Sequence, residues 1–278
     1  MTEAVREIPL SRPWVDEREE ELVLEVLRSG RLSLGPWIER FEELLAERVG
    51  APHAAAVSSG TAGLHMLCHF AGIGAQGPSA VFGFYPNKQM TTGEGGVVVT
   101  HSEDVWRQIV SLRNQGRSYG EGGGWFHHVR VGFNYRWTDV QAAIGIAQLE
   151  KLDRILELRA AAARRYGELL EDLGGIEGLP PDDAKHRRSW FVYVVRLGSD
   201  LDRGDVMTAL RREGVATAEY VPCIHLQPYM RERYGFGEGL CPVAEGVASR
   251  TLALPFFTQI EAEDQARVME VLRVAVGG

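Results

Sequence analysis

Hydrophobic and polar residues alternate along this chain with two periods, one typical of helices and one typical of short buried strands. Apolar residues recur at helical spacing in segments that predict helices at 17–29, 36–49, 61–71, 103–113, 138–170, 204–213 and 261–275. Short apolar runs bounded by glycine or polar residues predict strands at 53–59, 80–85, 95–100, 191–197 and 215–221. Because strands and helices alternate, the pattern predicts an α/β fold.

The length of the chain, 278 residues, allows one large domain or two modest ones. The sequence Pro-Pro-Asp-Asp at 180–183 is the clearest linker. We therefore predict a large α/β domain over 1–175 and a smaller C-terminal α/β domain over 176–278.

Charge and cysteine content narrow the possible partners and the compartment. The formal net charge of −8 argues against a surface that binds nucleic acid or anionic membranes. The first thirteen residues lack the basic-then-apolar order of a signal peptide, and no apolar run approaches membrane-spanning length. Three cysteines, Cys68, Cys223 and Cys241, cannot all pair within one chain. A reducing cytoplasm is the predicted location.

Lysine is rare in this chain, and one lysine has an unusual setting. Of the 30 lysine and arginine side chains, only three are lysines: Lys88, Lys151 and Lys185. Lys88 follows an apolar strand and precedes the glycine-rich sequence at 91–96, where burial would favour a neutral, nucleophilic amine. The other two lysines fit solvated turns. Lys88 is therefore the candidate for amine chemistry.

A second candidate site is the turn Ser58-Ser59-Gly60-Thr61-Ala62, where a predicted strand leads into a predicted helix. Backbone N–H groups at such a helix start point outward and bind phosphate well. The same sequence is also typical of an ordinary helix N-cap, so the turn alone does not decide between the two interpretations.

Two further patterns are less specific. Asn134 and Arg136 precede the helix that starts near Asp139, and their side chains could bind a phosphate or carboxylate or simply accompany a capped helix start. His65 and His69 have the spacing of a metal-binding pair. No carboxylate or second cysteine or histidine cluster lies near them in sequence, so we predict no metal site.

Five segments together resemble the DegT/StrS-type sugar aminotransferases, which are pyridoxal-phosphate (PLP) enzymes of fold type I. These segments are SSGTAGL (58–64), FGFYPNKQMTTGEGGVVVT (82–100), LRNQGR (112–117), GFNYRWTDVQAAIGIAQLEKL (132–152) and IHLQPY (224–229). The resemblance covers most of the chain in the right order, and the segments at 82–100 and 132–152 are specific. It implies an aminotransferase that uses PLP as its cofactor.

The resemblance also implies roles for matching residues. Lys88 matches the lysine that forms the Schiff base with PLP, the internal aldimine, and shuttles the proton between cofactor and substrate. Cofactor-binding positions are Ser59, Gly60, Thr61, Ala62, Gln76, Lys88 and Asn134, with Asn134 reaching the phosphate of a neighbouring subunit. This implies a homodimer with shared active sites. Tyr85, Glu94, Arg136 and His225 are candidates to contact the substrate.

The implied reaction moves an amino group from glutamate or glutamine to a keto-sugar nucleotide. Glu94 lies in the sequence GEGG, which resembles members that aminate carbon 4 of the hexose more than those that aminate carbon 3. Relatives that act on cyclitols or form aromatic amino acids stay possible. The alternative is a PLP-fold protein without catalysis that serves as a regulatory or scaffolding partner.

The chain departs from the family in one region. Only 25 residues separate Ala62 from Lys88, and the fold-type-I large domain apparently lacks a segment near 73–79. The family places several strands there, with an aromatic residue that stacks on the cofactor and an Asp-x-x-Gln motif. Gln76 could end that motif, but Ile73 stands at the aspartate position. Gly83 also stands where many members have a phosphate-binding serine.

Three explanations are open for the short region: residues omitted from the printed sequence, an engineered deletion, or a degenerate natural relative. A βαβ sheet without its middle strands would expose a long hydrophobic face. We therefore expect omitted residues between Gly72 and Ala80. A continuous chain at this point would favour the non-catalytic alternative.

Overall fold

A computed structural model of the chain describes residues 6–71, 79–118, 126–178 and 188–277. The chain separates into two compact units. The first unit is Pro13–Leu152, and the second unit is Asp153–Gly278 together with Met1–Arg12. The domain division at 175 and 176 stays a prediction.

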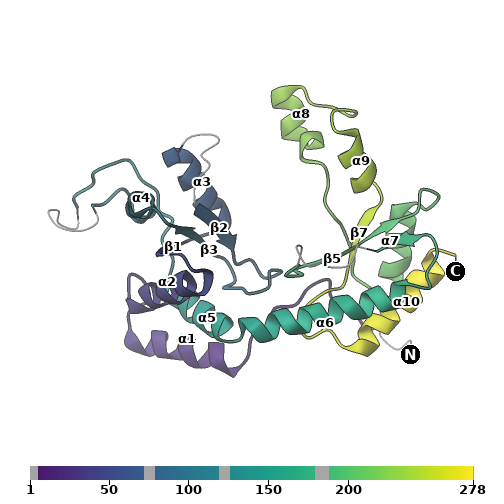
Figure 1. Cartoon of the computed structure of the whole chain (residues 1–278), viewed down its shortest axis with the longest axis horizontal. Coiled ribbons are helices and arrows are strands. Elements are labelled where there is room, and N and C mark those ends of the chain that lie inside the picture. Colours follow the sequence, from purple (N-terminus) through teal and green to yellow (C-terminus); the bar gives the residue numbers. More distant parts are fainter. Residues whose placement is uncertain (1–5, 72–78, 119–125, 179–187, 278) are drawn as a thin grey trace. The chain divides into compact units, whose positions relative to one another are not determined.

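The first unit consists of a three-stranded sheet with helices on both of its faces (Figure 1). Its helices are α1 (Glu17–Ser29), α2 (Pro36–Val49), α3 (Gly60–Ala71), α4 (Glu103–Arg113) and α5 (Asp139–Glu150). Its strands are β1 (His53–Val57), β2 (Ser79–Gly83) and β3 (Gly96–Thr100). The strand order is β1-β3-β2, and β3 pairs antiparallel with both neighbours.

Alternation along the strands divides the core of this unit into two layers. Val97 and Val99 of β3 face α1, α2 and α5, where the buried side chains of Phe41 and Trp137 lie. Val98 faces α3 and α4 on the other side. All five residues of β3 are buried, as expected for a central strand covered on both faces.

Helix α2 receives its N-terminal cap from another helix. Its own N-cap residue is Gly35, which has no side chain to accept a hydrogen bond. The buried carboxylate of Asp139 in α5 accepts hydrogen bonds from the N–H groups of Gly35 (2.9 Å) and Trp37 (3.2 Å) instead. A Cβ at Gly35 would lie 2.6 Å from Asp139 Oδ1, so only glycine allows this approach.

The second unit has a four-stranded antiparallel sheet. Its helices are α6 (Leu152–Leu170), α7 (Arg203–Arg212), the 3₁₀ helix η1 (Ile224–Leu226), α8 (Pro228–Tyr234), α9 (Pro242–Ala248) and α10 (Ala262–Ala275). Its strands are β4 (Ile176–Glu177), β5 (Tyr193–Leu197), β6 (Ala218–Glu219) and β7 (Thr251–Leu254), in the order β4-β5-β7-β6. Tyr166, Leu197, Leu210, Leu252 and Phe256 belong to its core.

The α/β class and most predicted elements are confirmed, but four features of the second half differ. The helix predicted over 138–170 is broken at Lys151, which leaves the helical region (φ −108°, ψ 10°). The strand predicted over 215–221 is reduced to β6, and the strands β4 and β7 were missed. The stretch after 221 contains η1, α8 and α9, and none of these was predicted. These short elements lack a long hydrophobic period, so pattern alone could not find them.

The expectation that residues are omitted between Gly72 and Ala80 is wrong, because the full amino-acid sequence has only the seven printed residues, 73–79, between these two positions. The physical reason given for it also fails for the described residues. Helix α3 buries Met66 against one face of the three strands, and α5 buries Ala143 against the other. Three strands are therefore enough to cover both helices.

Candidate active site

Lys88 lies in a tight loop that connects β2 to β3. Its backbone N–H donates to the carbonyl of Tyr85 (3.0 Å), which closes a turn directly after the strand. The buried Thr91 donates its hydroxyl to the carbonyl of Phe84 (2.9 Å) and so ties the two ends of the loop together. The Lys88 side chain is half-buried. The loop thus holds one amine at the end of the sheet.

The start of α3 lies at the same end of the sheet as the Lys88 loop. A Cβ at Gly60 would lie 3.3 Å from the Cα of Gly83, the last residue of β2. A Cβ at Gly96 would lie 2.5 Å from the backbone N of Gly60, so only glycine at 96 lets β3 pass this turn. Close backbone approach therefore brings the predicted phosphate turn beside the strand that leads to Lys88.

The hydrogen bonds at the start of α3 leave donors available. Ser59 Oγ accepts from the N–H of Ala62 (3.0 Å) and acts as the N-cap. The N–H groups of Gly60 and Thr61 are in the first turn, where no helical carbonyl can accept from them. Thr61 is exposed and Ala62 is buried. The turn therefore has the donor arrangement of an anion site.

The segment that contains Asn134 and Arg136 runs beside the end of β1. The N–H of Ser58 donates to the carbonyl of Tyr135 (2.9 Å). Arg136 donates to the side-chain oxygen of Asn114 (3.1 Å), and Asn134 is exposed. This contact brings the predicted amide and guanidinium to the same end of the sheet as the phosphate turn.

Glu94 is held by its backbone and not by its side chain. Its carbonyl accepts hydrogen bonds from Gln141 Nε2 (2.6 Å) and from the hydroxyl of Thr92 (2.7 Å). The Glu94 side chain is exposed, and Tyr85 is 54% exposed. Both predicted substrate residues are therefore available to a ligand at this end of the sheet.

His225 belongs to the second unit, in η1. Its Nε2 lies 2.8 Å from Glu245 Oε1 in α9. Hydrogen bonds from the backbone N–H groups of Gly239 and Cys241 and from His225 lower the pKa of Glu245 to about 2. This carboxylate therefore fixes the orientation of the His225 ring.

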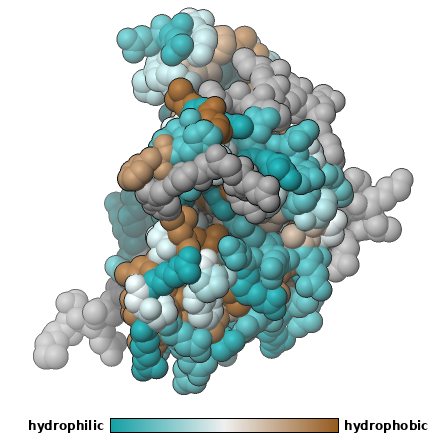
Figure 2. Space-filling view, turned by 90° about the vertical axis from the view of Figure 1, so that its left-hand side faces the viewer, coloured by the Kyte–Doolittle hydropathy of each residue, from teal (hydrophilic) through white to brown (hydrophobic). Residues whose placement is uncertain are grey.

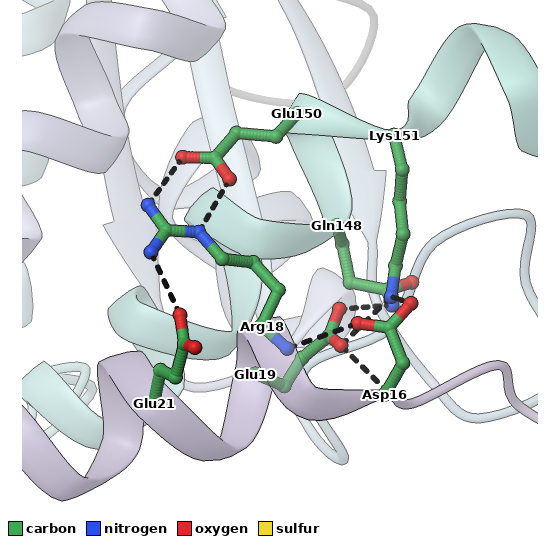
Figure 3. A network of polar contacts seen from close by, with 7 residues as sticks. All are labelled: Asp16, Arg18, Glu19, Glu21, Gln148, Glu150 and Lys151. Atoms are coloured by element: carbon green, nitrogen blue, oxygen red, sulfur yellow. Dashed lines mark hydrogen bonds and ion pairs between the residues drawn. The ribbon is translucent and has the colours of Figure 1, made fainter.

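The prediction that Lys151 is a solvated turn lysine is wrong. Its amine forms ion pairs with Asp16 (2.8 Å) and Glu19 (2.7 Å), and its side chain is only 14% exposed (Figure 3). Glu19 is 1% exposed, so its carboxylate needs this cation. The ion pair with Lys151 also lowers the pKa of Asp16. These bonds join the start of α1 to the end of α5, where the predicted long helix breaks.

Gln148 extends this network to the Lys88 loop. Its side-chain nitrogen donates to Glu19 (2.7 Å) and to the carbonyl of Trp14 (2.7 Å). Its side-chain oxygen accepts from the backbone N–H of Thr91 (3.3 Å). Gln148 is buried, with 1% of its surface exposed. A chain of charged and amide groups thus runs from Lys151 to the loop that carries Lys88.

The structure thus gathers most of the predicted site residues of the first unit at one end of its sheet. These are Ser59, Gly60, Thr61, Ala62, Tyr85, Lys88, Glu94, Asn134 and Arg136. Gln76 lies outside the described residues. Sequence reasoning missed Gln148 and Asn87, whose side-chain oxygen is buried without a hydrogen-bond partner among the described residues. Asn87 could have been noticed as the polar neighbour of Lys88, whereas nothing in the sequence marks Gln148.

Other features of the described residues add little to this site. The three cysteines are unpaired. No described helix has the length and apolar character needed to cross a membrane. The face drawn in Figure 2 is largely hydrophilic, with small groups of hydrophobic residues between polar ones.

Two curated proteins show what the chain is similar to in sequence. The uncharacterized protein MJ1066 of Methanocaldococcus jannaschii is 32% identical over 215 residues, which cover 73% of this chain and 55% of that protein. This chain therefore matches just over half the length of that relative. The spore coat polysaccharide biosynthesis protein SpsC of Bacillus subtilis is 26% identical over 98% of this chain and 97% of its own length.

The alignment with SpsC also shows how much this chain lacks. It spans 381 positions, 103 more than the 278 residues of this chain, so at least 103 positions of the relative have no counterpart here.

Solved structures show the same fold at low sequence identity. Helicobacter pylori PseC, an aminotransferase of pseudoaminic acid biosynthesis, has a TM-score of 0.88 at 18% identity, covering 98% of this chain and 99% of that chain. DesI, solved in the presence of its TDP-sugar product, has a TM-score of 0.85 at 24% identity and covers 99% of this chain and 95% of its own. These likenesses establish the predicted PLP-dependent transferase fold of type I.

A family profile matches residues 13–77 and 68–273, which is nearly the whole chain. The two matched parts overlap at 68–77, directly before β2, where this chain is short relative to the family. The resemblance drawn from the sequence is thereby confirmed: the chain belongs to the DegT/DnrJ/EryC1/StrS aminotransferase family.

Proposed function

We propose that this chain binds PLP at the end of its three-stranded sheet and transfers an amino group from glutamate or glutamine to a keto-sugar nucleotide, with carbon 4 slightly favoured. The observation that carries the proposal is that the start of α3 and the Lys88 loop meet through Gly60 and Gly83. An anion site and an amine are the two groups needed to hold a phosphorylated aldehyde.

The residues present fit the phosphate and the aldehyde of PLP. The N–H groups of Gly60 and Thr61 and the hydroxyl of Ser59 would bind the phosphate, and the Lys88 amine would bind the aldehyde. The unpaired buried oxygen of Asn87 beside Lys88 is an acceptor that a bound ligand could satisfy. None of the described residues can be assigned as the carboxylate partner of the ring nitrogen.

Each residue has a separate role in the proposed reaction. PLP, when bound, withdraws electrons from the substrate carbon that loses or gains a proton. Lys88 Nζ moves that proton. Tyr85 and Glu94 are exposed and Arg136 is half-buried, and these three side chains would orient the substrate. The family resemblance alone supports a substrate contact for His225. Asn134 would bind the phosphate in a neighbouring subunit of a cytoplasmic homodimer.

A second candidate function is favoured by one observation. At least 103 positions of SpsC are missing here, and the family profile places the gap directly before β2. The missing segment is where the ring-nitrogen aspartate and the stacking aromatic residue were expected. A PLP-fold protein that binds the cofactor without turnover, as a regulatory or scaffolding partner, would tolerate this loss.

Covalent labelling of Lys88 tests the proposal. Purified protein mixed with PLP should develop the visible absorbance of a lysine-bound cofactor, and borohydride reduction should fix the label on Lys88 in a peptide map. Lys88→Ala should abolish both signals and all amination of keto-sugar nucleotides, because no other described amine lies at this end of the sheet. Lys185→Ala is the matched control and should keep both.

The outcomes separate the two candidates. Label on Lys88 together with glutamate-dependent amination supports the aminotransferase. Label on Lys88 without conversion of the cofactor by glutamate or glutamine supports the non-catalytic alternative. Label on Lys151 or Lys185, or amination that survives in Lys88→Ala, would overturn the assignment of Lys88.

A further inference from the structure

The two edges of the three-stranded sheet are treated differently by the chain. On the outer side of β1, four of the backbone groups that point away from β3 have partners. The bonds are Trp106 Nε1 to the Ala54 carbonyl (3.0 Å), the Ala56 N–H to Glu42 (2.8 Å), Arg113 to the Ala56 carbonyl (2.5 Å) and the Ser58 N–H to the Tyr135 carbonyl (2.9 Å). The β1 edge is closed.

Strand register fixes which groups of β2 point outward. The backbone N–H and carbonyl groups of Ala54 and Ala56 point away from β3, so those of Ala55, between them, point toward β3. Ala55 pairs with Val98, whose N–H and carbonyl therefore point toward β1. Val97 and Val99 then direct theirs toward β2, where they oppose Phe82 and Ala80. The remaining residues of β2, namely Ser79, Val81 and Gly83, present their N–H and carbonyl groups outward.

The β2 edge has no partner in the described chain. No hydrogen bond between described residues reaches the outer side of β2, and the strand is the last in its sheet. Its five residues, Ser79–Gly83, contain no charge and no proline, the devices that usually protect an exposed edge. The Phe82 side chain is 42% exposed. The two parts of the chain that match the family profile overlap at 68–77, directly before this strand, so the family positions that this chain lacks fall beside this edge.

We propose that the β2 edge binds the β2 edge of a second copy of this chain, in antiparallel register about a two-fold axis at Val81. In this register Val81 opposes Val81 of the other copy, and Ser79 opposes Gly83. All three outward-facing residues then meet outward-facing residues, so every free N–H and carbonyl finds a partner.

Side chains fit the same register. The exposed Phe82 of each copy lies opposite Ala80 of the other, on one face of the joined sheet. Ala80 is also exposed and small, so it leaves space for the ring. Neither strand carries a charge, so the pairing meets no local repulsion although each chain has a net charge of −8. A second copy therefore fits this edge both in charge and in side-chain size.

Disulfide trapping tests the register directly, on apo protein and therefore independently of the proposed activity. In a background with Cys68→Ser, Cys223→Ser and Cys241→Ser, the substitution Val81→Cys should give a disulfide-linked dimer. Opposed residues of a hydrogen-bonded pair have Cα atoms about 5.5 Å apart, within disulfide range. Ser79→Cys is the control, because in this register the two copies of residue 79 are about 13 Å apart along the strands.

Removal of the outward donor gives a second, non-covalent readout. Val81→Pro deletes an N–H that β3 does not use, so the sheet should survive while the dissociation constant rises at least about tenfold by sedimentation. Val81→Thr keeps the N–H and should associate like the wild type. Equal trapping at positions 79 and 81, or no trapping by folded Val81→Cys protein, would overturn the proposal. A wild-type chain that stays monomeric at all concentrations would do the same. If Val81→Pro fails to fold, the trapping result decides.

Discussion

The two edges of the sheet in the first unit show two ways in which a sheet can end. At the β1 edge, Glu42 and Arg113 lie between the strand and the surrounding helices and satisfy both backbone groups of Ala56. At the β2 edge, Ser79, Val81 and Gly83 have no comparable partners among the described residues. The difference shows that the described chain covers one edge with its own side chains and leaves the other without a partner among the described residues.

The second unit ends its sheet in a third way. Its edge strands, β4 and β6, have two residues each, so they present few free backbone groups. Strand β2 differs from these edge strands, because it has five residues and presents more backbone groups at its edge. The candidate site residues lie at the end of the first sheet, next to β2, and the family profile is matched in two parts that overlap directly before this strand.

The largest effect is expected at the closed edge. Arg113→Met would leave the Glu42 carboxylate without its cation, and the two side chains are only 14% and 13% exposed. Loss of one partner from a buried pair costs about 3–5 kcal/mol of unfolding free energy. Urea unfolding of the variant measures this cost.

Arg107→Met is the matched control for Arg113→Met. Arg107 pairs with Glu103 on the same helix, α4, but their side chains are 55% and 57% exposed. An exposed pair contributes about 0–1 kcal/mol. Equal losses in the two variants would mean that the β1 edge does not depend on its buried ion pair.

A smaller effect is expected in the network that holds the loop between β2 and β3. Lys151→Met removes a charged hydrogen bond to the buried Glu19. Glu19 keeps its hydrogen bonds from Gln148 and from the N–H of Asp16, so the loss should cost only about 1.5–3 kcal/mol in urea unfolding. Arg18→Met is the control, because its bond to Glu150 joins the same two helices through side chains that are 45% and 44% exposed (Figure 3). If Arg18→Met lost as much unfolding free energy as Lys151→Met, the buried network would not contribute more than an exposed ion pair.

Much of the first unit could be predicted from the sequence, because its helices and strands are long enough to show their period. The β1-to-α3 turn and the Lys88 loop were found from local sequence: small residues at 58–62, and a lysine between an apolar run and several glycines. Backbone contacts such as that of Gly60 with Gly83 then follow from the fold. At these positions the local sequence was therefore enough to predict the local structure.

The features that could not be predicted depend on contacts between distant residues. Lys151 occurs in a helical pattern, and only its pairing with Asp16 and Glu19, more than 130 residues away, shows why the helix stops there. The Gln148 bond to Thr91 is also a tertiary contact without a local signal. The edge partners of β1 come from three separate segments: α2, α4 and the stretch that contains Tyr135. Periodicity carries no information about such pairings.

The smallest effect is expected at Gly83, where the bare strand meets the phosphate turn. A Cβ at Gly83 would contact only the Cα of Gly60, at an ordinary distance of 3.8 Å, so the fold has space for a side chain there. Gly83→Ser would place a hydroxyl beside the start of α3. If PLP binds there, one added hydrogen bond of about 1 kcal/mol should tighten its Kd about fivefold.

Gly83→Ala separates the hydroxyl from the added carbon atom. The alanine variant has the same Cβ and should bind PLP like the wild type, as measured by titration of the lysine-bound absorbance. The two variants should unfold at similar urea concentrations, because both add a side chain to the same space. If serine and alanine have the same Kd, the phosphate does not lie beside Gly83. The start of α3 would then be an ordinary capped helix, and the two groups that support the proposed function would no longer belong to one site.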